Sequence, residues 1–188
     1  ITIRATNVRI LPTCRPGFLD PEQAGEGFPF DQLQYSSLWA NTPVHVSHAT
    51  ADRSWYFVET AHVFGWVRAG DLAFVSDEQA ARITALPLAA IIRDRVAVNN
   101  VSGQFLFQAR IGMLLPDMEA GGQGPTCLVL GSDKNMQAVI REVELEQAWV
   151  EPFPLMATSA NCLRVARQFP GEAYGWGGLF QNRDCSAF

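Results

Sequence analysis

Short runs of β-branched and aromatic residues, separated by turn residues, constrain the fold of this chain more than any other feature. The first three runs are VHVSHA, SWYFVET and HVFGWVRAGDLAFV, all between residues 44 and 75. Strands this short and this closely spaced are typical of a small antiparallel barrel of about 60 residues. The sequence therefore predicts a first barrel over residues 43–86.

A second block of strand-like runs follows with a similar rhythm and size. Its runs are RVAVNN, QFLFQARIGMLLPDM, CLVLGSD and QAVIREVEL, with a glycine-rich loop at EAGGQGP. We therefore expect a second, related barrel over residues 87–154. Between the two blocks, Ser76 precedes Gln79 by three residues, a capping-box pattern that predicts a short helix over residues 77–86, ending at Pro87.

The two ends of the chain differ from the barrels in composition. Residues 1–42 are rich in proline and glycine, which predicts an extended arm with one short helix between Asp31 and Trp39. After residue 154, Thr158 or Ser159 can cap another helix. The apolar positions of this helix are three residues apart, at Leu163, Ala166 and Phe169. This helix opens a third unit, residues 155–188.

Charge and cysteine usage exclude several classes of function. The 188 residues carry a net charge of −5 and a single lysine, Lys134, which argues against a nucleic-acid partner. No apolar run reaches the ~18 to 20 residues that a helix needs to span a membrane, so the sequence predicts no membrane-spanning helix. The four cysteines form no CxxC pair, so we do not expect a zinc site. We expect no other metal and no cofactor. The chain starts at Ile1 rather than Met, which predicts that an upstream segment has been removed.

The chemistry of the chain is concentrated near its end, in EAYGWGGLFQNRDCSAF. A cysteine acts as a nucleophile only as the thiolate, which a helix N-terminus or a basic neighbour stabilises. Glycines and a polar loop precede Cys185, and CSAF suits the first turn of a helix, whose N–H groups would face the sulfur. A buried, inert cysteine is the alternative interpretation.

Residues 174–187, YGWGGLFQNRDCSA, resemble the catalytic motif of the NlpC-type papain-like cysteine peptidases. The segments LPTCRPGF, GEGFPFDQLQYSSLW, FVET and GWVRAGDLA resemble the subgroup with two N-terminal bacterial SH3-like domains, the γ-D-glutamyl-L-diamino acid endopeptidases. The resemblance implies a mainly β fold. It would have an extended arm, two tandem SH3-like barrels, and the first helix and loop of an α+β papain-like catalytic domain.

The resemblance also implies roles for five residues of the motif. Cys185 would be the nucleophile, and Tyr174 would donate its hydroxyl to the oxyanion or to the substrate backbone. Asp184 and Ser186 would hold the free α-amine of the L-alanine that begins a peptidoglycan stem peptide. Trp176 would line the alanine pocket.

Glu59, in the first barrel, is a possible second partner of that amine. An exposed strand carboxylate is the alternative for Glu59.

The general base of this family is a histidine that follows the cysteine, whereas His45, His48 and His62 all precede it. The sequence therefore predicts that the catalytic domain is incomplete in residues 1–188 and that this fragment alone has no peptidase activity. His45 and His48 are three apart on one expected strand, so we expect them on opposite faces, where they cannot share a metal.

Two classes of function remain open from the sequence. The first is a cysteine endopeptidase that cleaves the γ-D-glutamyl–diamino acid bond of stem peptides with a free N-terminal L-Ala. The second is a non-catalytic SH3-like module that binds cell wall or a protein partner. A disulfide at Cys185 is a further alternative. We expect the protein in the cell envelope, either periplasmic or exported, including a lipid-anchored form, with the cytoplasm as the alternative.

Overall fold

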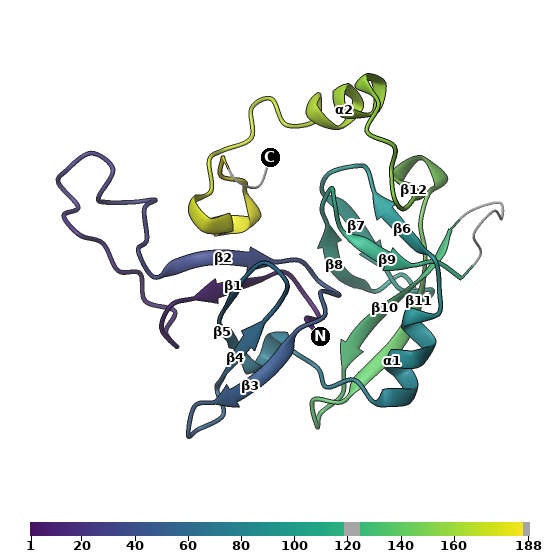
Figure 1. Ribbon diagram of the computed structural model, residues 1–188, viewed down its shortest axis with the longest axis horizontal. Coiled ribbons are helices and arrows are strands. Elements are labelled where there is room, and N and C mark those ends of the chain that lie inside the picture. Colours follow the sequence, from purple (N-terminus) through teal and green to yellow (C-terminus); the bar gives the residue numbers. More distant parts are fainter. Residues whose placement is uncertain (119–124, 186–188) are drawn as a thin grey trace. The chain divides into compact units, whose positions relative to one another are not determined.

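The structure, a computed structural model, describes residues 1–118 and 125–185, which form two compact units (Figure 1). The first unit comprises Ala5–Leu38, Thr42–Leu72 and the segment from Gly171 onward. The second unit comprises Ile1–Arg4, Trp39–Asn41 and Ala73–Pro170. The mainly β composition expected from the strand-like runs is confirmed.

The first unit is built on one antiparallel sheet of five strands in the order β2-β1-β5-β4-β3. These strands are β1 (Thr6–Arg9), β2 (Gln34–Leu38), β3 (His45–Ala49), β4 (Trp55–Glu59) and β5 (Phe64–Arg68). A short 3-10 helix, η1 (Ala69–Asp71), follows β5. Val8, Val58 and Val67 are fully buried, so each of their three strands contributes an apolar side chain to the core of the unit.

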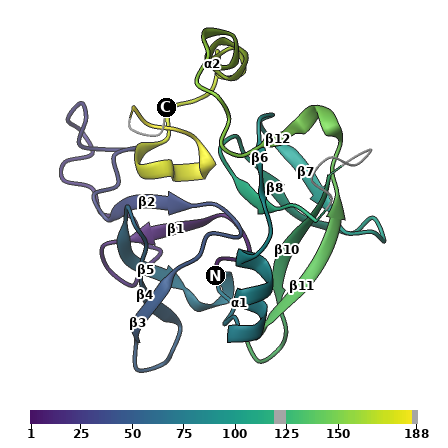
Figure 2. The ribbon, with the colours of Figure 1, turned by 45° about the vertical axis from the view of Figure 1, so that its right-hand side comes forward.

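The helix predicted between Asp31 and Trp39 is wrong, because this segment forms strand β2. Thr6 pairs with Leu38 and Asn7 pairs with Ser37, so residues of the expected arm supply two neighbouring strands to the sheet (Figure 2). The barrel sheet therefore begins at β1 rather than at residue 43. Backbone pairing with β1 outweighs the weak local preference for a helix.

The second unit contains the remaining strands and both α-helices of the described residues. The strands are β6 (Leu88–Ile91), β7 (Val96–Asn99), β8 (Phe105–Ala109), β9 (Leu114–Pro116), β10 (Thr126–Ser132), β11 (Ala138–Glu144) and β12 (Val150–Pro152). They form the antiparallel sheet β12-β6-β9 and the pairs β7-β8 and β10-β11. A 3-10 helix, η2 (Gln147–Trp149), precedes β12. The glycine-rich loop predicted at residues 119–125 lies outside the described residues except for Pro125.

Both helices begin where the sequence predicts. In α1 (Asp77–Thr84), Ser76 Oγ accepts a hydrogen bond from Gln79 N at 3.2 Å, and Gln79 Oε1 accepts one from Ser76 N at 3.1 Å. This confirms the capping box. In α2 (Ser159–Ala166), Thr158 Oγ1 accepts a hydrogen bond from Asn161 N at 3.2 Å. Within the described residues, neither helix is long and apolar enough to cross a membrane.

Helix α2 and the residues after it up to Pro170 belong to the second unit, whereas the segment from Gly171 onward belongs to the first. Gln168, just after α2, donates its Nε2–H to the carbonyl of Ile92 at 2.7 Å, and its Oε1 accepts from Asp94 N at 3.1 Å. The expected boundary at residue 155 therefore differs from the division between compact units, which falls after Pro170.

Candidate active site

The segment around the predicted nucleophile folds back as a loop against strand β2 of the first unit (Figure 2). Its central part, η3 (Trp176–Gln181), consists of two short helical turns separated by a kink, and Gly177 and Gly178 have φ angles of 54° and 79°. A Cβ atom on Gly178 would overlap Ser37 Oγ, and one on Gly177 would lie 2.9 Å from the carbonyl oxygen of Gln34. The loop therefore needs glycine for both its left-handed backbone and its close approach to β2.

An ion pair and two backbone contacts close the base of this loop. Arg183 Nη1 lies 2.7 Å from Glu172 Oε2. Tyr174 and Arg183 form an isolated parallel β-bridge, and Gly175 N donates to the Arg183 carbonyl at 3.0 Å. These contacts bring residues on either side of η3 together and place Asp184 and Cys185 directly beyond the closure.

The Tyr174–Arg183 bridge brings Tyr174 alongside the segment that carries Asp184 and Cys185. Partial desolvation raises the pKa of the Tyr174 phenol above its ordinary value, and the negative charges of Cys185 and Asp184 raise it further. Asp184 Oδ2 accepts a hydrogen bond from Gly177 N at 3.2 Å, which fixes one carboxylate oxygen. Cys185 is exposed, and Tyr174 is 48% exposed, so both side chains are open to a substrate.

Trp176 is held between the loop and the segment that precedes β2. Its Nε1–H donates to the backbone carbonyl of Asp31 at 3.0 Å, and its indole packs edge-on against Phe30 at 5.3 Å between ring centroids. Phe30 also contacts the Tyr174 ring, with 6.3 Å between centroids. The expected role of Trp176 in lining an alanine pocket stays a prediction.

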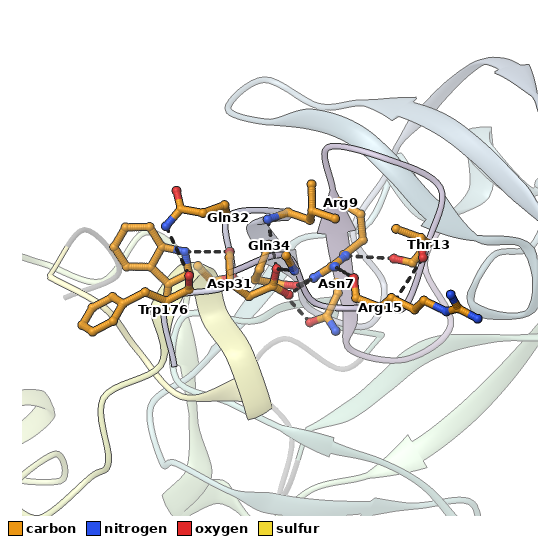
Figure 3. Close-up of polar contacts among 12 residues, drawn as sticks. Asn7, Arg9, Thr13, Arg15, Asp31, Gln32, Gln34 and Trp176 are labelled. Atoms are coloured by element: carbon orange, nitrogen blue, oxygen red, sulfur yellow. Dashed lines mark hydrogen bonds and ion pairs between the residues drawn. The ribbon is translucent and has the colours of Figure 1, made fainter. Parts of the chain in front are cut away.

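A buried polar network extends from Trp176 to Arg9 of strand β1 (Figure 3). Arg9 Nη1 contacts Asp31 Oδ2 at 2.5 Å and Gln34 Oε1 at 3.1 Å. Gln34 Nε2 in turn donates to the carbonyl of Gly177 at 2.9 Å. Sequence reasoning missed this network and the Glu172–Arg183 pair. The only local signals were the position of Arg183 beside Asp184 and the polar residues within PFDQLQ.

None of the contacts described above involves two of the predicted site residues, Ser186 and Glu59. Ser186 lies outside the described residues, so its role remains a prediction. Glu59 is an exposed residue at the end of β4, paired with Phe64 of β5 and with His45 of β3. Its role toward the substrate amine also remains a prediction.

The expectation that His45 and His48 point to opposite faces is wrong. The pairing of β3 with β4 shifts register between Val46 and His48, so that His45 lies opposite Glu59 and His48 opposite Phe57. Positions two apart on β4 share a face, and the bulge therefore puts both histidines on the same face. Within the described ranges 1–118 and 125–185, no cluster of three or more His, Cys, Asp or Glu side chains could hold a metal.

The four cysteines are free and differ sharply in environment. Cys14, Cys162 and Cys185 are exposed. Cys127 lies in the core of the second unit, where burial raises the pKa of its thiol to about 12, with a smaller contribution from the charge of Asp117. A buried, inert thiol therefore describes Cys127 and not Cys185, which is exposed and unbonded to another cysteine within residues 1–118 and 125–185.

Comparison with known proteins identifies both barrels as bacterial SH3 domains. The family described as SH3 domain (SH3b1 type) matches residues 16–68, and the family described as SH3 domain of SH3b2 type matches residues 73–117. No curated protein matches the chain significantly.

One solved structure similar to this chain is that of a novel NlpC/P60 endopeptidase from Photobacterium damselae subsp. piscicida. The two share 25% sequence identity with a TM-score of 0.86 over 99% of this chain. The chain spans 40% of the length of that protein. The tandem SH3 arrangement expected from the sequence is thereby confirmed, together with the resemblance in fold to an NlpC/P60 enzyme.

Proposed function

We propose that the chain carries the nucleophile of a cell-wall cysteine endopeptidase that cleaves the γ-D-glutamyl–diamino acid bond of peptidoglycan stem peptides with a free N-terminal L-alanine. The observation that carries the proposal is the Tyr174–Arg183 bridge, which brings a phenol alongside the two residues that supply a carboxylate and an exposed thiol, Asp184 and Cys185. The similarity in fold between this chain and an NlpC/P60 endopeptidase also supports a peptidase reaction.

In the proposed reaction the Cys185 thiolate attacks the carbonyl carbon of the γ-glutamyl amide, and the C=O electron pair moves to oxygen. Tyr174 donates a hydrogen bond to this oxyanion. Collapse of the tetrahedral intermediate breaks the C–N bond, and the amine of the diamino acid takes a proton and leaves. Water then hydrolyses the Cys185 thioester and releases the shortened peptide.

The proton transfers require a general base. We assign this role to a histidine, as the resemblance to the family implies. It would lie in the part of the enzyme that has a counterpart in the solved neighbour but is not covered by this chain. A base hydrogen-bonded to the thiol is needed because a free cysteine is only slightly ionised at neutral pH.

Asp184 is suited to bind the substrate ammonium. One of its oxygens accepts the hydrogen bond from Gly177 N, and an ionised carboxylate has further lone pairs for a positively charged donor. In the proposal, Ser186 shares the amine with Asp184, Trp176 lines the alanine side chain, and Glu59 is a second acidic partner.

The tandem SH3 domains favour a second candidate function, a module that binds cell wall without cleaving it. In either case the proposed partner is peptidoglycan, and the proposed location is the cell envelope, with the cytoplasm as the alternative. The two functions differ in whether Cys185 is needed for turnover.

The test uses the full-length gene product and the tripeptide L-Ala-γ-D-Glu-diaminopimelate, with release of free diaminopimelate as the measurement. We expect Cys185→Ser to abolish release and Cys162→Ser, which changes another exposed thiol, to leave it unchanged. Peptide binding without release by the unmodified protein would favour the binding module. Release that survives Cys185→Ser would refute the assignment of the nucleophile.

A further inference from the structure

Asp31 and Gln34 are buried polar residues at the place where the first SH3 domain meets the loop that carries Cys185. Asp31 precedes β2, and Gln34 is the first residue of that strand. Buried carboxylates and amides are costly unless their hydrogen bonds are made, so the partners of these two residues indicate what they do.

Arg9 of strand β1 fixes both residues from one side. Its Nη1 contacts Asp31 Oδ2 and Gln34 Oε1, while its Nε and Nη2 donate to the carbonyls of Thr13 and Arg15 at 3.0 and 2.8 Å. The guanidinium is therefore held by four acceptors and cannot rotate without losing several bonds (Figure 3).

Asp31 is held in its charged form by this arrangement. Burial alone disfavours the carboxylate, but hydrogen bonds from Arg9 and from the backbone N–H groups of Gly17 and Leu33 outweigh it and keep the pKa of Asp31 below its ordinary value. The carboxylate therefore stays ionised and anchors the backbone of the segment before β2.

Two hydrogen bonds pass from this anchor to the loop. The Asp31 carbonyl accepts from Trp176 Nε1 at 3.0 Å, and Gln34 Nε2 donates to the Gly177 carbonyl at 2.9 Å. Since Gln34 Oε1 accepts from Arg9, the amide is oriented with its NH₂ group toward Gly177. Arg9 thus sets which end of the Gln34 amide faces the loop.

Gly177 relays this anchoring to the site. Its carbonyl accepts from Gln34, and its N–H donates to Asp184 Oδ2 at 3.2 Å. Arg9, Gln34, Gly177 and Asp184 therefore form one continuous chain of hydrogen bonds that ends beside Cys185.

We propose that Gln34 and Asp31, oriented by Arg9, are positioning residues through which the first SH3 domain holds the Trp176–Gly178 turn and, with it, Asp184 and Cys185. The catalytic meaning of this proposal rests on the proposed peptidase function. On this basis the first SH3 domain is part of the scaffold of the catalytic loop, in addition to any role in binding cell wall.

The test replaces Gln34 by Glu in the full-length protein. Glutamate has nearly the same shape and still accepts from Arg9, but its carboxylate cannot donate to the Gly177 carbonyl. Gln34→Met is a second variant, because the buried carboxylate of Gln34→Glu could prevent folding. Methionine is uncharged and also removes the hydrogen bond to the Gly177 carbonyl. The matched control is Gln32→Glu, because Gln32 is exposed and its amide donates only locally, to the Phe30 carbonyl at 3.2 Å.

For Gln34→Glu and Gln34→Met we expect kcat on the tripeptide to fall by about 10- to 100-fold, since small displacements of reacting groups have effects of this size. Gln32→Glu should stay within about twofold of the unmodified protein. The rate at which iodoacetamide alkylates Cys185, measured well below the unfolding temperature, should change by about threefold or more, and that of Cys162 should not. A loss that is purely structural would lower the unfolding temperature without changing the Cys185 rate in the folded protein.

A folded Gln34 variant with kcat and Cys185 alkylation within twofold of the unmodified protein would overturn the proposal. If the unmodified protein hydrolyses no stem peptide, the proposed function fails. The ratio of Cys185 alkylation rates between the Gln34 variants and the unmodified protein still decides whether Gln34 positions the loop.

Discussion

Arg183 Nη1 and Glu172 Oε2 lie 2.7 Å apart, and their side chains are only 6% and 12% exposed. The pair closes the loop whose last described residues are Asp184 and Cys185. Removal of one member of a buried ion pair leaves the other charge unpaired, which typically costs about 3 to 5 kcal/mol.

Glu172→Gln should therefore loosen the loop, and hydrogen exchange of the amides between residues 172 and 183 should become markedly faster. The reversed pair Glu172→Arg with Arg183→Glu should recover part of the protection. Glu151→Gln is the control, because Glu151 and its partner Arg164 lie at a similar distance of 2.9 Å but their side chains are 35% and 42% exposed. An exposed pair contributes at most about 1 kcal/mol. Equal effects of Glu172→Gln and Glu151→Gln on their own segments would contradict this account.

Gly178→Ala should displace the loop from β2, because the new Cβ would overlap Ser37 Oγ and the residue has a φ of 79°. Gly103 is a matched control with a φ of 80° and no atom within 4 Å of a built Cβ. Gly103→Ala isolates the backbone strain, about 1 kcal/mol. We expect Gly178→Ala to lower the free energy of unfolding by clearly more than Gly103→Ala, as measured by urea titration. Indistinguishable losses would show that the contact with Ser37 carries no weight.

Cys127 should make the free energy of unfolding decrease as the pH rises through the alkaline range. Burial raises the pKa of its thiol in the folded protein to about 12, from an ordinary value of 9.0. The unfolded chain therefore loses this proton first as the pH rises, and the contribution of the thiol to stability is present below about pH 9 and lost progressively between pH 9 and 12. Urea titrations at pH 8 and pH 10.5 should show the decline, and Cys127→Ala should reduce its slope. Native Cys127 should also resist iodoacetamide at pH 7.5, whereas alkylation as fast as that of Cys162 would contradict its burial.

Tyr174→Phe should lower kcat on the tripeptide by about 10²-fold while changing KM little, if the hydroxyl stabilises the oxyanion. The phenol keeps its proton well into the alkaline range because its pKa is raised. Ionisation of Tyr174 should therefore cause no fall in kcat with rising pH below about pH 10. Tyr35→Phe, which removes the hydroxyl of another half-exposed tyrosine, is the control. A fall in kcat of less than threefold for Tyr174→Phe would exclude a role for the hydroxyl in the transition state.

The sequence by itself predicted the features that depend on local chemistry. The short runs of β-branched and aromatic residues predicted strands in the first barrel, Ser76 and Gln79 predicted the start of α1, and the YGWGG and DCS segments marked the loop that holds Cys185. Each of these signals is complete within a few residues, so propensity, periodicity and motif suffice to detect it.

The tertiary structure alone decided the features that depend on distant partners. Residues 34–38 became a strand because β1 was available for pairing, and a bulge in β3 placed His45 and His48 on one face. The hydrogen bonds from Gln34 to Gly177 and from Trp176 to Asp31 join residues 143 and 145 positions apart. A local segment carries no information about a partner at that separation. The folded sheet brings these groups together, and their burial makes each unmade hydrogen bond costly.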